Sequence, residues 1–371
     1  MYYDLLSPID RLKNLNIRLI LVITLLSCIG FMTLYSAAGG AFFPWALPQI
    51  LRFLFGFILM ILIAISNLQW WFNASYLFYG AALCCLVAVE LFGKVGMGAQ
   101  RWLDLYLFKL QPSELIKLSL VLALATYFHR LNTDDVYKPT QLIVPLGMIF
   151  LPALFVLKQP DLGTTILLVL IGLTILFVAG VRMWYFLSLG IGLLVSLPFA
   201  WAFLKDYQRN RVLTFLNPEK DPQGTGYHIM QSKIAIGSGG ILGKGYLKGT
   251  QGYLNFLPEK QTDFIFTLFS EEFGLMGSLV LITLYVLLLS MGVKIALKNK
   301  TKFGQLLSFG ITMTIFIYLS INLCMVLGLV PVVGVPMPLI SYGGTSMITL
   351  MIAFGLLLNT DVNYQNKILK Y

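Results

Sequence analysis

Apolar segments of about 20 residues recur along the whole chain, and this pattern constrains the fold more than any other feature of the sequence. About 20 consecutive apolar residues in a helix span the hydrocarbon core of a bilayer. Ten segments meet or approach that length: 17–37, 47–66, 73–92, 113–129, 141–157, 162–180, 183–204, 263–293, 303–329 and 343–360. The fifth is short enough to fit a re-entrant segment as well. We therefore predict an all-α polytopic membrane protein with about ten transmembrane helices.

The composition supports a membrane protein. The 371 residues are 58% hydrophobic and 11% charged, whereas ordinary soluble domains carry roughly 25% charged residues. The net charge of +10 is explained by the positive-inside bias and by anionic headgroups, so we expect no nucleic-acid partner. The four cysteines lack the spacing of a zinc site and are interpreted as small buried hydrophobic side chains: Cys28, Cys84, Cys85 and Cys324.

The distribution of lysine and arginine predicts the orientation. A cytoplasmic N-terminus leaves only four of these residues on the short outer loops: Lys94, Arg101, Lys109 and Lys158. Such an asymmetry is typical of inner-membrane proteins. Both termini are then cytoplasmic, and the one large loop, about 205–262, is extracytoplasmic between the seventh and eighth helices. The apolar part of 17–36 is too long for a cleaved signal peptide and is interpreted as the first span.

No linker or charge block marks a second domain, so 1–371 is expected to form a single integral membrane domain. Within the large loop, 225–238 is predicted to form a short helix on the membrane surface. The glycine-rich stretch that follows allows a ligand to approach the backbone closely. It is no Walker loop, because Ser238 and Gly245 replace the required residues. Asp263 ends the stretch where an apolar segment begins, and we predict that its carboxylate does the chemistry.

Ionisable residues inside or at the ends of spans are costly and therefore informative. Glu114 and Lys117 are three residues apart and share one helix face. They form either an ion pair that fixes helix packing or the charged floor of a polar cavity. Glu271 and Glu272 are interpreted as structural groups.

Three cations, on Arg52, Arg101 and Lys117, are expected towards the outer side, where a lipid pyrophosphate would need them. Arg52 also fits a side chain that reaches the lipid headgroups. Asp161 either caps the sixth helix or belongs to the site.

Five sequence motifs occur in order along the chain: QPSELIK (111–117), QPDLGT (159–164), NRVLTFLNPE (210–219), GSGGILGKGYLKGTQGYLNFLPEKQTDFIF (237–266) and GVPMPLISYGGTS (334–346). This combination resembles the SEDS (shape, elongation, division and sporulation) family of bacterial cell-wall glycosyltransferases, and GKG followed by GTQ resembles its elongation branch. The resemblance implies ten spans with both termini in the cytoplasm. It also implies polymerisation of lipid II, an undecaprenyl-pyrophosphate-linked disaccharide-peptide, beside a class B penicillin-binding protein.

The resemblance places the essential aspartate of that family on Asp263. Its other functional positions fall on Trp102, Glu114 and Asp161. Gln261 replaces a histidine that is frequent in the family, so no titrating group is expected there.

We therefore predict an inverting glycosyl transfer at the outer membrane face with Asp263 as general base. The predicted substrate-binding residues are Arg52, Arg101, Trp102, Glu114, Lys117, Asp161, Lys244, Glu259 and Lys260. A divalent cation, Mg²⁺ or Mn²⁺, is a candidate partner of the pyrophosphate. Two alternatives stay open from sequence: a lipid II flippase, and a non-catalytic scaffold for the penicillin-binding protein.

Overall fold

The computed structural model describes residues 7–96, 99–104, 109–203, 209, 213–215, 217, 225–250, 259–365 and 368. Within these ranges each of the ten predicted segments coincides with a helix: α2 (Ile17–Ala37), α3 (Ala46–Ile65), α4 (Leu68–Phe92), α5 (Pro112–Arg130), α6 (Pro139–Lys158), α7 (Leu162–Val178), α8 (Met183–Phe203), α12 (Ile265–Lys298), α13 (Lys302–Val326) and α14 (Gly344–Val362). The shorter helices are α1 (Pro8–Lys13), α10 (Thr225–Ser238) and the 3-10 helix η1 (Thr133–Tyr137). The helix expected at 225–238 is thus confirmed.

Seven of the described helices are long and apolar enough to cross a membrane: α2, α3, α4, α6, α12, α13 and α14. Helix α7 has 17 residues, and α5 carries the charged pair Glu114 and Lys117. The all-α membrane class is confirmed, while the number of ten spans stays a prediction. Much of the 205–262 loop, including most of the NRVLTFLNPE motif, lies outside the described residues.

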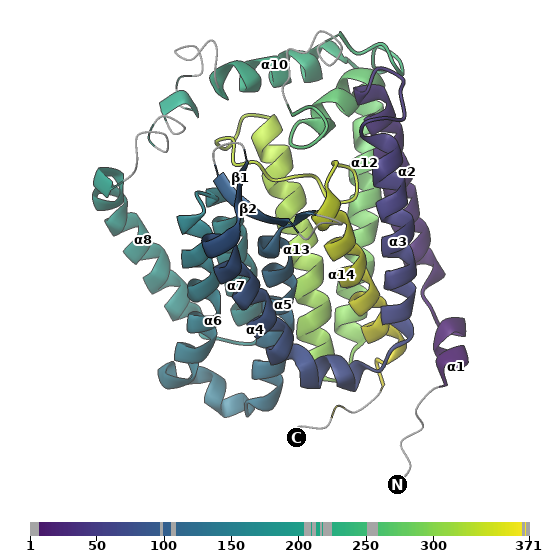
Figure 1. Cartoon of the computed structure of the whole chain (residues 1–371). Helices are drawn as coiled ribbons and strands as arrows, with labels where there is room; N and C mark the ends of the chain where they lie inside the picture. Colours follow the sequence, from purple (N-terminus) through teal and green to yellow (C-terminus); the bar gives the residue numbers. More distant parts are fainter. Residues whose placement is uncertain are drawn as a thin grey trace.

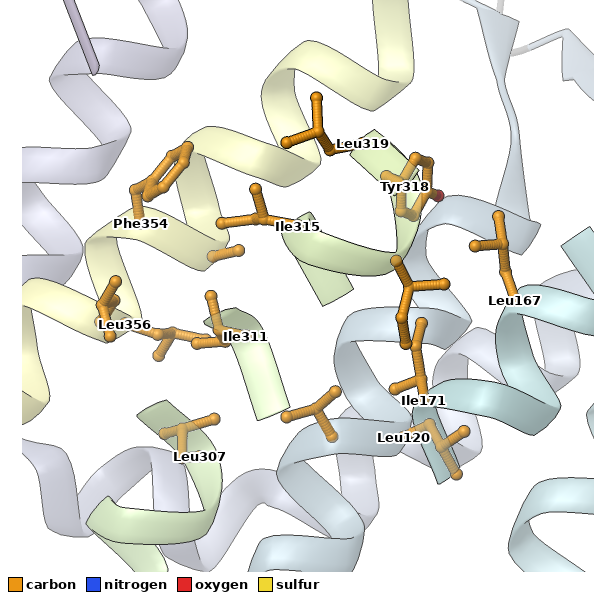
Figure 2. Close-up of a cluster of buried hydrophobic side chains, with 14 of the residues drawn as sticks. Leu120, Leu167, Ile171, Leu307, Ile311, Ile315, Tyr318, Leu319, Phe354 and Leu356 are labelled. Carbon is orange, nitrogen blue, oxygen red and sulfur yellow. The ribbon is translucent and has the colours of Figure 1, made fainter. Parts of the chain in front are cut away.

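Helix α13 lies in the centre of the bundle, where it contacts α5, α7, α12 and α14 (Figure 1). Its buried residues Leu307, Ile311 and Ile315 follow one another at four-residue spacing and therefore share a face. Figure 2 shows these side chains in one buried apolar cluster that also includes Leu120 of α5 and Phe354 of α14. Because lipid is as apolar as this core, close packing rather than exclusion of water stabilises the contact. Helix α8, in contrast, leans away from the bundle towards its C-terminal end (Figure 1).

The apolar pattern alone did not tell which helix faces meet lipid. Cys28 and Cys84 are exposed on α2 and α4, so the prediction that all four cysteines are buried is wrong for these two. In a membrane helix the lipid-facing surface has the same composition as the protein core. A cysteine in an apolar segment is therefore compatible with either position.

Polar caps set several helix starts. Asn16 accepts a hydrogen bond from the Leu19 N–H at the start of α2, and Asp161 accepts one from the Thr164 N–H at the start of α7. Such caps satisfy N–H groups that have no partner inside the helix. They explain why these helices begin near the predicted residues.

Helix α12 is broken at Gly274, where φ is 65° and ψ is −161°. The glycine-rich segment 239–250 docks into this break. The Lys244 N–H donates to the Glu271 carbonyl (3.0 Å), and beyond the break the Leu275 N–H donates to the Gly240 carbonyl (2.9 Å). The segment thus supplies partners for backbone groups that the break would leave unpaired.

A small antiparallel sheet follows α4, and the sequence did not predict it. Its strands β1 (Lys94–Gly96), β2 (Ala99–Asp104) and β3 (Lys109–Leu110) lie side by side in that order. Trp102 pairs with Lys94, and Leu103 pairs with Leu110. The sheet brings Arg101, on β2, to the end of the bundle where α7 begins (Figure 1).

The two terminal regions lie at the opposite end of the bundle. Asp361, near the end of α14, accepts hydrogen bonds from Asn16 at the start of α2 (3.0 Å) and from Lys298 at the end of α12 (3.1 Å). The chain therefore enters its first long helix and leaves its last one on the same side, as the predicted orientation requires.

Candidate active site

Asp263 lies in a turn, 259–264, that leads into α12. The Glu259 carbonyl accepts hydrogen bonds from the N–H groups of Thr262 (3.1 Å) and Phe264 (3.4 Å), which closes the turn. The Asp263 side chain is partly buried. Among the described residues, no N–H or hydroxyl group donates to its carboxylate oxygens. This carboxylate is therefore available to a ligand.

The pKa of Asp263 is raised to about 7, chiefly because the buried carboxylate loses hydration in its charged form. The negative charges of Glu259 and Asp161 contribute to this rise, whereas the positive charge of Arg101 opposes it. A carboxyl group with a pKa near 7 exchanges protons readily at neutral pH, which is what a general base requires. The structure thus brings together four predicted site residues from three separate regions of the sequence.

Asp161 fulfils both roles that the sequence left open. It caps α7, and its other carboxylate oxygen lies 3.7 Å from the Arg101 guanidinium. Arg101 also donates to the carbonyls of Gln159 (3.3 Å) and Pro160 (2.5 Å), just before the helix. These bonds fix the start of α7 beside the Asp263 turn.

The residues around Asp263 on its own turn are also partly buried. Glu259 accepts hydrogen bonds from the side chains of Gln261 (3.2 Å) and Thr262 (3.0 Å). Gln261 therefore orients the Glu259 carboxylate, and its amide group carries no proton that titrates near neutral pH. Burial lowers the pKa of the Lys260 ammonium. Trp102 is partly exposed and follows Arg101 on β2, so the two side chains point to opposite faces of the strand.

The predicted pairing of Glu114 and Lys117 is confirmed. Their charged groups are 2.7 Å apart, and both side chains are almost fully buried. The hydroxyl group of Tyr318, on α13, contacts the Lys117 ammonium and lies 3.2 Å from a Glu114 oxygen. The third partner makes this a three-membered polar cluster between α5 and α13.

This cluster lines a small cavity of about 40 Å³. Polar groups of Gln49, Ser341 and Ser346 lie in the same wall, and the remaining lining is mostly aliphatic, including Val121 and Ile311. The cavity is therefore amphipathic: it offers a polar region and an apolar region to one ligand. The pair is thus an ion pair that also lines a cavity, and its role with a substrate stays a prediction.

The segment 333–343, called here the inner loop, separates this cavity from the Asp263 turn. Pro336, Met337 and Ser341 line the cavity, whereas a side chain added at Gly334 would lie 3.5 Å from the Asp263 carboxylate. Gly334 has a φ of 69°, a conformation that residues with a Cβ rarely adopt. The backbone of the inner loop can approach Asp263 because this residue is glycine.

Arg52, on α3, lies beside the inner loop. Its guanidinium is 4.9 Å from the centre of the Tyr342 ring, and one of its nitrogens is buried without a partner among the described residues. The Tyr342 N–H in turn donates to the Gln261 carbonyl (2.8 Å). Arg52 is thus connected to the Asp263 turn, in contrast to the alternative in which it only reaches lipid headgroups.

Lys244 has a different environment from the other predicted site residues. Its ammonium lies 2.7 Å from the Glu271 carboxylate, which also accepts hydrogen bonds from the backbone and hydroxyl groups of Thr250. The Glu272 carboxylate accepts a hydrogen bond from the Ser36 hydroxyl of α2. These contacts fit the prediction that the two glutamates are structural. A pyrophosphate would have to displace the Lys244–Glu271 pair.

Within the described ranges, no group of three or more His, Cys, Asp or Glu side chains forms a metal site. The carboxylates whose negative charges act on Asp263 are those of Glu259 and Asp161. Mg²⁺ is commonly held by one or two carboxylates together with substrate phosphates. A divalent cation at Asp263 would therefore need oxygen ligands from the substrate.

Comparisons with known proteins agree with this geometry. A family profile described as "Cell cycle protein", covering FtsW, RodA and SpoVE, matches residues 15–366. The chain belongs to the FtsW/RodA/SpoVE family. It is 48% identical to the peptidoglycan glycosyltransferase MrdB of Escherichia coli (strain K12) over 288 residues, which are 77% of each protein. It is 34% identical to the stage V sporulation protein E of Bacillus subtilis, over 93% of this chain and 96% of that one. The resemblance inferred from the motifs is confirmed.

Solved structures of the FtsW/RodA/SpoVE family share the fold. A chain from a peptidoglycan synthase complex that coordinates polymerization and crosslinking superimposes with a TM-score of 0.83 at 30% identity, covering 95% of this chain and 99% of that one. Rod shape determining protein RodA of Thermus thermophilus gives a TM-score of 0.72 at 26% identity and covers 95% and 98%.

Four polar residues of the site were missed by the sequence analysis: Gln49, Tyr318, Asn322 and Ser341. These four side chains carry no charge at neutral pH, so they are not among the costly charged groups of the spans. A neutral amide or hydroxyl is also unfavourable in an apolar helix unless it is hydrogen-bonded. Gln49 and Asn322, isolated amides in apolar segments, carried that signal.

Proposed function

We propose that this chain is a peptidoglycan glycosyltransferase that polymerises lipid II at the outer face of the bacterial cytoplasmic membrane, with Asp263 as the general base. The observation that carries this proposal is the partly buried Asp263 carboxylate, with a pKa near 7, beside Arg101 and Asp161. Two further observations support it: the relative in E. coli is named a peptidoglycan glycosyltransferase, and the family resemblance assigned functional positions to both Asp263 and Asp161.

In the proposed reaction, the 4-hydroxyl oxygen of an acceptor N-acetylglucosamine attacks C1 of a donor N-acetylmuramic acid. The bond from C1 to the pyrophosphate oxygen breaks, and polyprenyl pyrophosphate leaves with the electron pair. Asp263 accepts the hydroxyl proton. A single displacement converts an α-linked donor into a β-linked product, so one base suffices without a covalent intermediate.

Cations would stabilise the leaving pyrophosphate. Arg52 and Arg101 are the guanidinium groups connected to the Asp263 turn, and arginine offers two parallel donors to a phosphate. Lys260 belongs to the same turn. Lys117 is paired with Glu114 at the cavity. It would bind a part of the substrate that enters between α5 and α13. Trp102 would offer an aromatic surface on the face of β2 opposite to the Arg101 side chain.

The proposed partner is a class B penicillin-binding protein, which would crosslink the strands that this chain makes. The likeness to a chain of a peptidoglycan synthase complex supports such an assembly. The proposed location is the cytoplasmic membrane, with both termini in the cytoplasm and Asp263 outside. The shared position of Asn16 and Asp361 at the end of the bundle remote from the inner loop is consistent with that orientation.

The test is polymerisation of purified lipid II by the purified full-length protein, with and without its penicillin-binding partner. Asp263→Asn should insert and fold but lose activity by about 10²–10⁴-fold, as is typical when a general base is removed. Neither a flippase nor a scaffold forms a glycosidic bond, so polymerisation separates these alternatives. Normal polymerisation by Asp263→Asn would show that another group accepts the proton.

A further inference from the structure

The side chain of Asn322 connects the centre of the bundle to the Asp263 turn. Asn322 lies on α13 and is fully buried. Its amide nitrogen donates one hydrogen bond to the backbone carbonyl of Asp263 (2.9 Å) and another to the carbonyl of Val335 in the inner loop (2.7 Å). An asparagine side chain has two N–H donors, so both are used.

The two preceding carbonyls of the same turn are held in a similar way. The Ser341 hydroxyl donates to the Thr262 carbonyl (2.6 Å) and accepts from the Met337 N–H (2.7 Å). The Tyr342 N–H donates to the Gln261 carbonyl (2.8 Å). Three consecutive carbonyls, at positions 261, 262 and 263, are therefore bound by donors that are distant in sequence.

These bonds hold the backbone from which the Asp263 side chain extends. Helix α12 begins only at Ile265, so the three carbonyls precede the regular hydrogen bonds of that helix. Carbonyl groups away from water are unfavourable without donors. Donors in fixed positions on α13 and the inner loop both satisfy the carbonyls and fix the backbone that carries the Asp263 side chain.

We propose that Asn322 is a positioning residue for glycosyl transfer, which holds the turn 261–263 so that the Asp263 carboxylate faces Asp161 and Arg101. Ser341 has the same role through its single hydrogen bond to the Thr262 carbonyl. This inference rests on the proposed function of Asp263, since it assigns a supporting group to that base.

The charged groups that face Asp263 are Glu259 of its own turn, Asp161 at the head of α7 and Arg101 of β2. From α13 and the inner loop, the contacts of the described residues with this turn are the neutral groups of Asn322, Ser341 and Tyr342. Release of the turn would admit water to Asp263. Hydration favours a charged carboxylate, so the pKa of Asp263 would fall towards its ordinary value.

The test compares Asn322→Leu with Asn359→Leu in the full-length protein. Asn359 is a matched control: it is also fully buried, and its amide donates to the carbonyls of Ile63 (2.7 Å) and Ser66 (2.8 Å) at the other end of the bundle. Both variants lose a buried amide that holds backbone carbonyls. Only Asn322 holds the Asp263 turn.

Two quantities are measured at several pH values: the rate of lipid II polymerisation, and the modification of Asp263 by dicyclohexylcarbodiimide, which reacts with protonated carboxyl groups. For Asn322→Leu we expect kcat to fall about a hundredfold with KM nearly unchanged, because a misplacement of about 1 Å costs that much. The midpoint of Asp263 modification should shift to lower pH by about one unit. Asn359→Leu should lower thermal stability but leave kcat and the midpoint unchanged.

An unchanged midpoint and kcat in Asn322→Leu, relative to Asn359→Leu, would overturn the proposal. If Asn322→Leu does not fold, Ser341→Ala removes the bond to Thr262 with a smaller change and should lower kcat about tenfold in the same direction. If kcat of Ser341→Ala is unchanged, the proposal is likewise overturned. The modification midpoint is measured without catalysis, so it still tests the positioning if Asp263→Asn proves active and the base assignment fails.

Discussion

The buried cluster of Glu114, Lys117 and Tyr318 allows a quantitative test of the cavity. Lys117→Met would leave the Glu114 carboxylate, whose side chain is 10% exposed, with the Tyr318 hydroxyl as its remaining partner in the cluster. Removing one partner of a buried pair costs about 3–5 kcal/mol. Glu114→Gln leaves the Lys117 ammonium, whose side chain is 4% exposed, with neutral acceptors only, so its cost should also be about 3–5 kcal/mol. The double variant holds no charge and should recover most of the stability.

The surface pair of Asp135 and Lys138 provides the control. It has the same three-residue spacing and the same 2.7 Å distance, but the lysine side chain is 63% exposed. Lys138→Met should therefore cost about 0–1 kcal/mol. Thermal unfolding of all the variants in lipid nanodiscs, together with a double-mutant cycle, gives the coupling between Glu114 and Lys117.

Polymerisation assays on the same variants decide what the pair does. We expect the double variant Glu114→Gln/Lys117→Met to be folded and inactive, because both side chains line the cavity. If the double variant recovers stability and polymerises lipid II at the normal rate, the pair only fixes helix packing, and the substrate does not need its charges.

The remaining predictions concern pH and orientation. Polymerisation should rise with pH through about 7, the pKa of Asp263, because the base must be deprotonated; a profile flat from pH 5 to 8 would contradict this. The pKa of Asp263 is raised on folding, so the folded state binds more protons between about pH 4 and pH 7, and this group makes the protein less stable as pH rises through that window. Asp263→Asn should therefore raise the unfolding temperature at pH 8 but hardly at pH 4, as scanning calorimetry would reveal. In intact spheroplasts, a membrane-impermeant maleimide should label Lys248→Cys and not Lys300→Cys, which are both exposed positions. The reverse pattern would place Asp263 in the cytoplasm and remove the basis for the proposed function.

The sequence by itself determined the helices and singled out the carboxylate of Asp263 as a candidate. Apolar segments of membrane-spanning length, begun by residues such as Asn16 and Asp161, are local properties, and each produced a helix near the expected bounds. Asp263 stood out because a carboxylate beside an apolar segment is costly and therefore informative. The Glu114–Lys117 pair could be predicted because three-residue spacing on a helix places two side chains on one face.

Only the tertiary structure decided which distant residues surround Asp263. Periodicity predicts neither the position of Arg101 on a small sheet nor the hydrogen bonds from Asn322 and Ser341. In this bundle the lipid-facing and buried surfaces are alike, so the pattern of apolar residues does not identify which helices are neighbours. The same limit applies to the glycine-rich segment, which the sequence assigned to a ligand. In the structure its residues 239–250 supply hydrogen bonds to α12 where that helix breaks at Gly274, since backbone groups inside a membrane protein must find partners within the protein.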